Sequence, residues 1–204
     1  MIVYIESNFV LELAFLQEEY ESCDTIIKLA ESQQIQLVIP AFSIAEPYTA
    51  LDRRSKERKA LHDRLESEIR ELSRSKPYSE IRNDSEKLTG ILIQSGEEEK
   101  QRLDTVLGRI LGCAGIVPMG GEILRAAAEY QKPLGLSLPD SVIYASVVAH
   151  MSSALTKPKC FLNKNSKDFV NPCIQDRLAS YDCRLITRFA DGLGYIRHQL
   201  GRSG

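Results

Sequence analysis

Five short runs of apolar, largely β-branched residues alternate with longer helical segments along this 204-residue chain. Each run is short and ends at polar residues, glycine or proline, a pattern typical of buried strands. Strands that alternate with helices form a parallel sheet covered on both faces and joined by right-handed crossovers. The sequence therefore predicts an α/β fold, with strands at residues 2–5, 36–39, 115–117, 159–162 and 183–187.

Carboxylates stand just after these predicted strands or at the start of a helix on the same edge. The first strand ends in Glu6-Ser7-Asn8, and Glu46 follows the second. Asp140 begins an apolar helix, and the loop Asn163–Asp168 follows the fourth strand. Ligand sites in such sheets form beyond the carboxyl ends of the strands. We therefore expect acidic side chains from four separate segments to converge there.

Helix capping is a competing explanation for the same residues. Ser7-Asn8 suits an N-cap, and a carboxylate near a helix N-terminus is stabilised by the helix dipole. Ser43 and Glu46 have capping-box spacing, and Ser137 can cap the helix that contains Asp140. Without further information, capping explains each acid taken alone.

A cluster of carboxylates needs a counter-charge, because ionised carboxylates repel one another unless a divalent cation neutralises them. Oxygen ligands completed by water suit Mg²⁺ or Mn²⁺ better than zinc. Such ions activate a water molecule and stabilise charge on a phosphodiester. A converged site of this kind would thus be hydrolytic.

Residues 51–112 have the pattern of an all-helical block. We expect a first helix that ends at Pro77, a second from about residue 83 to a stop at Gly96, and a third that begins at Glu97. The first helix has an apolar stripe with steps of four, four and three, which predicts a surface for self-association or for a partner. The stripe consists of Leu61, Leu65, Ile69 and Leu72.

One dense basic run lies one to two helical turns beyond Glu46. A solvated helix face and an RNA-binding face both explain it. The candidates for RNA binding are Arg53, Arg54, Lys56, Arg58 and Lys59, together with Lys164 in the loop after the fourth strand.

Composition limits the class of protein. A net charge of -2 means that any nucleic-acid contact must come from a local basic patch. The length and the 43% hydrophobic content predict one domain, residues 1–204. Five scattered cysteines without a C-x-x-C pair argue against a disulfide framework or zinc knuckle, and no apolar run is long enough to span a membrane. We expect a soluble cytoplasmic protein without a membrane partner.

The acidic segments resemble the four motifs of PIN-domain nucleases, in that family's order. They are Tyr4–Asn8, Pro40–Glu46, Leu138–Ala145 and Phe161–Phe169. The resemblance spans roughly residues 1–190, with a helical expansion between the second and third motifs. It implies a three-layer sandwich around a five-stranded parallel sheet of order 3-2-1-4-5. The activity it implies is hydrolysis of single-stranded or structured RNA with Mg²⁺ or Mn²⁺.

The resemblance also assigns roles to residues. The catalytic and metal-binding acids would be Glu6, Glu46, Asp140 and Asp168. Supporting roles would go to Ser7, Asn8, Asn163 and Asn165. The chain departs from the family twice, with Glu6 in place of the usual aspartate and Asn163 in place of threonine or serine. Either Asn165 or Asp168 could be the residue that faces the metal.

Three functions therefore compete. The leading hypothesis is a metal-dependent endoribonuclease, one form of which is the toxin of a toxin–antitoxin pair, with RNA, a cognate antitoxin or a second copy as partners. The alternative is a non-catalytic PIN-like module that binds RNA or a protein, for which Glu6 is the supporting feature. An unrelated doubly wound protein, such as a phosphatase or receiver domain, is disfavoured because no D-x-D-x-T follows the first strand and no lysine ends the fifth.

Overall fold

A parallel sheet with its first strand in the centre organises the fold. The structure is a computed structural model that describes residues 1–78, 81–154 and 158–202. The strand order is β3-β2-β1-β4-β5, and all four pairings are parallel. The strands are β1 (Ile2–Tyr4), β2 (Gln36–Pro40), β3 (Ala114–Val117), β4 (Lys159–Leu162) and β5 (Cys183–Ile186). The predicted fold class, strand order and central first strand are confirmed.

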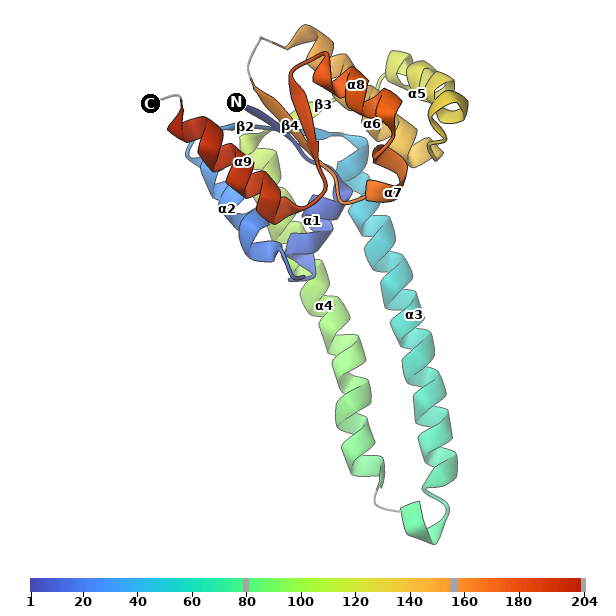
Figure 1. The fold of residues 1–204 in the computed structure, drawn as a ribbon. Coiled ribbons are helices and arrows are strands. Elements are labelled where there is room, and N and C mark those ends of the chain that lie inside the picture. The colour runs from blue at the N-terminus through green and yellow to red at the C-terminus, as the bar shows by residue number, and fades with distance from the viewer. Residues whose placement is uncertain (79–80, 155–157, 203–204) are drawn as a thin grey trace.

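Helices cover both faces of this sheet in three layers (Figure 1). One face carries α1, α2, α9 and the C-terminal part of α4, and the other carries α5 to α8. The helices are α1 (Ser7–Ala14), α2 (Tyr20–Glu31), α3 (Phe42–Leu72), α4 (Ile81–Cys113), α5 (Gly121–Leu134), α6 (Leu138–Ser153), α7 (Ser166–Phe169), α8 (Pro172–Ala179) and α9 (Phe189–Gly201).

Alternation along the strands divides the core into two clusters. Val3 and Ile5 of the β1 segment face the α1 layer, and Ile2 and Tyr4 face the α6 layer. A strand buried on both faces has no polar face, which explains the continuous apolar runs in the sequence. Helix α6 is buried almost all round, as its sequence predicts.

The segment after β1 differs from its prediction. Apolar residues from Phe9 to Leu16, followed by Ile26, Ile27 and Leu29, predict one continuing helical pattern, but the structure has two helices, α1 and α2. Leu16 between them adopts a left-handed backbone conformation with φ of 50°, which no regular right-handed helix contains. The short helices α7 and α8, after β4, were not predicted at all.

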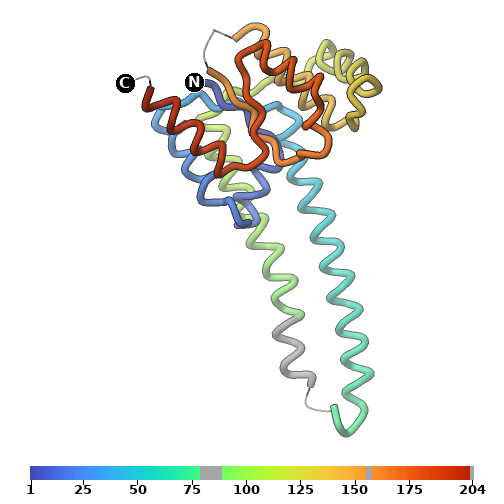
Figure 2. Tube along the Cα trace, viewed as in Figure 1, coloured from blue at the N-terminus to red at the C-terminus, as the bar shows by residue number. Residues whose placement is uncertain are grey.

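Helices α3 and α4 form a long hairpin that projects away from the three layers (Figures 1 and 2). The predicted helix boundary at Gly96 is wrong, because α4 runs through this residue without a break. Glu97 is therefore not a helix start. Glu99 lies inside α4, is 5% exposed, and binds both guanidinium nitrogens of Arg58 on α3 at 2.8 Å. This ion pair ties the two helices together.

The apolar stripe on α3 is largely exposed. Leu61 is 47% exposed, Leu65 is 38% and Leu72 is 46%, although α3 packs against α4. Among the described residues of α3, those that are buried all precede residue 52. The surface predicted for self-association or a partner is therefore still available on the hairpin, and its role stays a prediction.

Two further expectations concern cysteines and membranes. All five cysteines are free thiols in this structure. In the described part of the chain, no single helix has the length and apolar character to cross a membrane. By length and composition alone, α5 and α6 meet that requirement as a pair, with a bend of 116° between them.

Gly96 offers a test of the uninterrupted α4. A Cβ added there would meet no atom within 4 Å, so Gly96→Ala should stabilise the helix by up to about 1 kcal/mol. Gly135 ends α5 with φ of 68°, so Gly135→Ala should destabilise the protein by about 1 kcal/mol. Urea unfolding of both variants measures these changes. Loss of stability in Gly96→Ala would contradict a continuous helix.

Candidate active site

Glu6 lies at the carboxyl end of the central strand and begins α1. It is the N-cap of this helix, and its Oε2 accepts hydrogen bonds from the backbone N–H of Asn8 at 2.8 Å and from the hydroxyl of Ser7 at 3.0 Å. The side chain is buried, with 2% exposed. Its second oxygen, Oε1, is buried with no hydrogen-bond partner in the described part of the chain. Capping therefore uses only half of this carboxylate.

The electrostatics of Glu6 favour its protonated form. Burial raises the pKa of its carboxyl to about 7, and repulsion from Glu46 adds to that increase. The hydrogen bonds from Asn8 and Ser7 lower the pKa, but they offset only part of the desolvation. A negative charge on this group is costly at neutral pH unless a cation lies nearby.

Glu46 approaches from α3, which follows the neighbouring strand β2. Its Oε2 and the Oγ of Ser43 are both buried without a hydrogen-bond partner among the described residues. The predicted capping box of Ser43 and Glu46 is wrong, because Ala41 is the N-cap of α3 and no side chain caps it. A buried polar atom without a partner costs about 1–3 kcal/mol, and such atoms often indicate an ion or water at the site.

Asp140 and Asp168 form a second acidic pair. The side-chain amide of Asn165 donates to Asp140 Oδ1 at 3.2 Å and to Asp168 Oδ2 at 2.7 Å. Ser137 caps α6 and also donates its hydroxyl to Asp140. The predicted cap is therefore confirmed, but it engages only one oxygen of Asp140.

Asn163 shapes the loop that carries Asn165. It is 1% exposed, its backbone N–H donates to the carbonyl of Ile186, and its Oδ1 accepts from the backbone N–H of Asn165 at 2.8 Å. This is an Asx-type turn, in which a side chain replaces a backbone acceptor. Asn163 thus has a supporting role in the structure, since it fixes the start of the loop after β4.

The acids are arranged as two pairs rather than as one closed cluster. Glu6 and Glu46 form the first pair, and Asp140 and Asp168 form the second through Asn165. Among the described residues, no three His, Cys, Asp or Glu side chains come together closely enough to hold a metal ion. That Glu6, Glu46 and Asp140 share a cation therefore stays a prediction. The donors still fit Mg²⁺ or Mn²⁺, which bind through one or two carboxylates and keep several waters.

The basic candidates divide into two groups. Arg58 is bound to Glu99, Arg54 lies 3.5 Å from the same carboxylate and 4.4 Å over the ring of Phe15, and Lys164 donates to Glu12 at 2.8 Å. These contacts are structural, and nothing in the sequence pattern distinguishes them from surface charges. Arg53, Lys56 and Lys59 are exposed to solvent.

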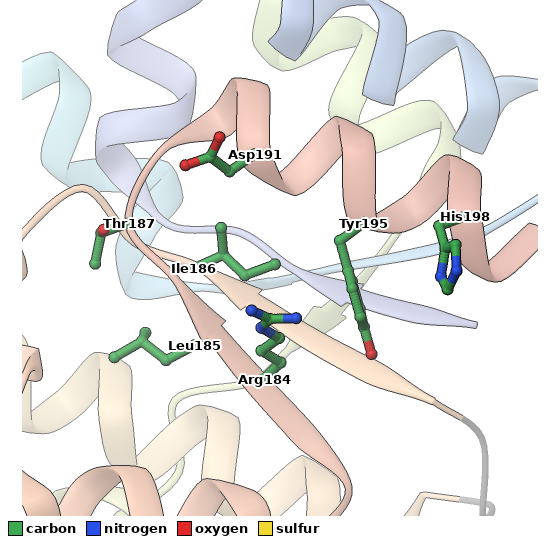
Figure 3. A pocket seen from close by; sticks show the side chains of 7 residues that line it. All are labelled: Arg184, Leu185, Ile186, Thr187, Asp191, Tyr195 and His198. Carbon is green, nitrogen blue, oxygen red and sulfur yellow. The ribbon is translucent and has the colours of Figure 1, made fainter.

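An open pocket of about 480 Å³ lies elsewhere, between β5 and α9 (Figure 3). Its polar lining includes Asp191 and His198, and the guanidinium of Arg184 lies 5.5 Å from the ring centre of Tyr195. None of the predicted site residues lines this pocket. The acidic edge is therefore the better candidate for the active site.

The model of the PIN domain family matches residues 3–169. The chain belongs to the PIN domain family, whose members are generally nucleases that use divalent metals. A solved structure of VapBC2 from Rickettsia felis, bound to a DNA fragment from their promoter, is similar with 14% identity and a TM-score of 0.45. The match covers 91% of this chain and 98% of that one. No match was found among curated proteins.

The raised pKa of Glu6 predicts a specific pH dependence of stability. Between pH 4.5 and 7 the folded, metal-free protein holds a proton on Glu6 that the unfolded chain has lost. The stability that the proton on Glu6 contributes is therefore fully present below pH 4.5 and is lost as the pH rises from 4.5 through 7. Glu6→Gln should gain stability over wild type across that window, by on the order of 3 kcal/mol.

Chemical unfolding in EDTA at several pH values measures this difference. Glu129→Gln, at an exposed position on α5, is the matched control and should show no such trend. A constant difference between Glu6→Gln and wild type from pH 4.5 to 8 would show that Glu6 is an ordinary carboxyl.

Proposed function

We propose that this protein is a metal-dependent endoribonuclease that hydrolyses phosphodiester bonds of RNA. The observation that carries the proposal is the pair of buried oxygens on Glu6 and Glu46 that have no hydrogen-bond partner among the described residues. Glu6 follows β1 and Glu46 lies in the second turn of the helix that follows β2, beyond the carboxyl edge where parallel sheets bind ligands. Membership of the PIN domain family supports the same chemistry. The preference for RNA comes from the resemblance of the four motifs.

Each acid has a distinct task in this proposal. Glu6 and Glu46 would hold the cation through the oxygens that have no partner among the described residues, and Asp140 and Asp168 would contribute a second pair of carboxylates. Bound Mg²⁺ or Mn²⁺ supplies an activated water and stabilises charge on the phosphodiester. Asn165 keeps the second pair together, because one amide donates to both carboxylates. Glu6 must lose its proton before it can hold a cation, so binding should weaken below about pH 7.

A non-catalytic module remains the second candidate. The observation in its favour is that, within the described residues, no three acids form a complete metal cluster. Glu6 is also one methylene longer than the aspartate usual at that position of the family. The two candidates differ in whether bound metal leads to cleavage.

Asp140→Asn tests the chemistry. The change keeps the size of the side chain and removes one negative charge, so RNA cleavage with Mn²⁺ should fall by at least roughly a hundredfold while the fold is retained. Cleavage of a mixed single-stranded RNA pool in Mn²⁺, Mg²⁺ or EDTA measures activity, and thermal melts measure folding. Asp191→Asn, at an exposed position on α9, is the matched control.

The results separate three accounts. Cleavage that persists in EDTA, or an Asp140→Asn variant as active as wild type, would refute the proposed mechanism. A melting temperature that rises with Mn²⁺ in the absence of any cleavage would favour the non-catalytic module.

The exposed basic residues on α3 test RNA binding. Replacement of Arg53, Lys56 and Lys59 by glutamine should weaken RNA binding. It should also reduce the slope of log K against log salt concentration by about 2, because each phosphate contact to a single strand contributes about 0.7 to that slope. Fluorescence anisotropy at several salt concentrations, in an Asp140→Asn background, measures the slope. The exposed residues Arg184, Arg188 and Arg197 provide a control triple variant. An unchanged slope would assign the α3 residues to solubility.

A further inference from the structure

An ion pair between a buried carboxylate, Glu12, and a lysine that is 38% exposed, Lys164, joins α1 to the loop after β4. Glu12 of α1 is 0% exposed and is separate from the four candidate acids. Its Oε2 accepts from Lys164 Nζ at 2.8 Å, and its Oε1 accepts from the backbone N–H of Glu19 at 2.6 Å. Both oxygens are therefore satisfied, in contrast to those of Glu6. A buried carboxylate is tolerated when it is paired and hydrogen-bonded in this way.

A third charged group completes this arrangement. The carboxylate of Glu19 accepts from the backbone N–H groups of Phe189 and Ala190, so it caps α9 from a distant part of the chain. Its Oε2 also lies 3.9 Å from Lys164 Nζ. Burial lowers the pKa of Lys164, but its contacts with Glu12 and Glu19 outweigh burial and raise the pKa overall. The lysine is thus held as a cation between two acids.

Lys164 stands between the two asparagines that build the site loop. On one side of it, Asn163 accepts from the backbone N–H of Asn165. On the other side, the amide of Asn165 donates to Asp140 and Asp168. The Lys164 side chain reaches α1 instead, where it meets Glu12. Adjacent residues of one loop therefore bind helices on the two faces of the sheet, α1 on one and α6 and α7 on the other.

We propose that Lys164 is a positioning residue, whose ion pair with Glu12 fixes the loop of residues 163–165 so that Asn165 holds Asp140 and Asp168 in register. The proposal rests on the proposed function only where cleavage is the measurement. Under this proposal Lys164 is no longer a candidate for RNA binding, because its ammonium group is paired with Glu12. Removal of the lysine would leave Glu12 as an unpaired buried charge and would release one side of the loop.

Lys164→Met is the test variant, and Lys164→Arg is the conservative rescue. Lys167, an exposed lysine on α7, provides the matched control Lys167→Met. Mn²⁺ affinity, measured by electron paramagnetic resonance, should weaken roughly ten- to hundredfold in Lys164→Met, the usual effect of losing an outer contact of a metal site. Lys164→Arg should retain most of the affinity, and Lys167→Met should match wild type.

Two measurements separate positioning from plain destabilisation. In metal-free protein, the side-chain amide resonance of Asn165 should shift in Lys164→Met but not in Lys167→Met. In cleavage assays, the Mn²⁺ concentration for half-maximal rate should rise, and saturating Mn²⁺ should restore much of the rate. A variant that is merely less stable would keep the wild-type Mn²⁺ affinity and amide resonance in its folded fraction.

The outcomes distinguish this proposal from the proposed function. If the wild-type protein binds Mn²⁺ but does not cleave RNA, the proposed nuclease function is wrong. The Mn²⁺ affinity and the Asn165 resonance of Lys164→Met then still test the role of Lys164. If wild type binds no Mn²⁺, the Asn165 resonance alone decides. If Lys164→Met does not fold, Glu12→Gln replaces it, because it keeps the shape and deletes the charge. A folded variant with unchanged affinity and an unchanged Asn165 resonance overturns the proposal.

Discussion

The burial of carboxylates at the ends of parallel strands is the constraint on which this structure depends. Glu6 lies just after the central strand β1, as the N-cap of α1, and Glu46 lies on α3, which follows the neighbouring strand β2. Their buried oxygens, which have no hydrogen-bond partner in the described part of the chain, are destabilising in the metal-free protein. A cation would relieve that cost. The feature that destabilises the metal-free protein would therefore also give the site its affinity for the cation.

This fold buries two kinds of acid: those whose carboxylates are paired with a cationic side chain, and those that have an oxygen without a partner in the described part of the chain. Glu12 and Glu99 are as buried as Glu6, but each is bound by a cation on another element, Lys164 and Arg58 respectively. These pairs hold the loop after β4 and the base of the hairpin in place. Burial alone therefore does not distinguish a candidate site acid, whereas burial without a partner among the described residues sets Glu6 and Glu46 apart.

The sequence predicted the elements that local chemistry determines. The five apolar runs predicted the five strands, and Glu6 after the first run predicted the edge of the candidate site. Both predictions rest on local features, the apolar character of a buried strand and the polar residues at its end. The break at Gly96 was wrong, because packing against α3 and the Arg58–Glu99 pair outweigh a modest helix propensity cost. The partners of Glu12 and Glu99 could not be predicted, since they are 152 and 41 residues away in the chain.

The central claim is that Glu6 and Glu46 hold a divalent cation through their unpartnered oxygens. Anomalous diffraction from a crystal soaked in Mn²⁺ tests it most directly, because it locates the ion. The account predicts a peak about 2.1 Å from Glu6 Oε1 and Glu46 Oε2, a distance typical of hard cations with oxygen ligands. The account would be contradicted if no peak lay between Glu6 and Glu46 and their oxygens instead accepted hydrogen bonds from protein groups.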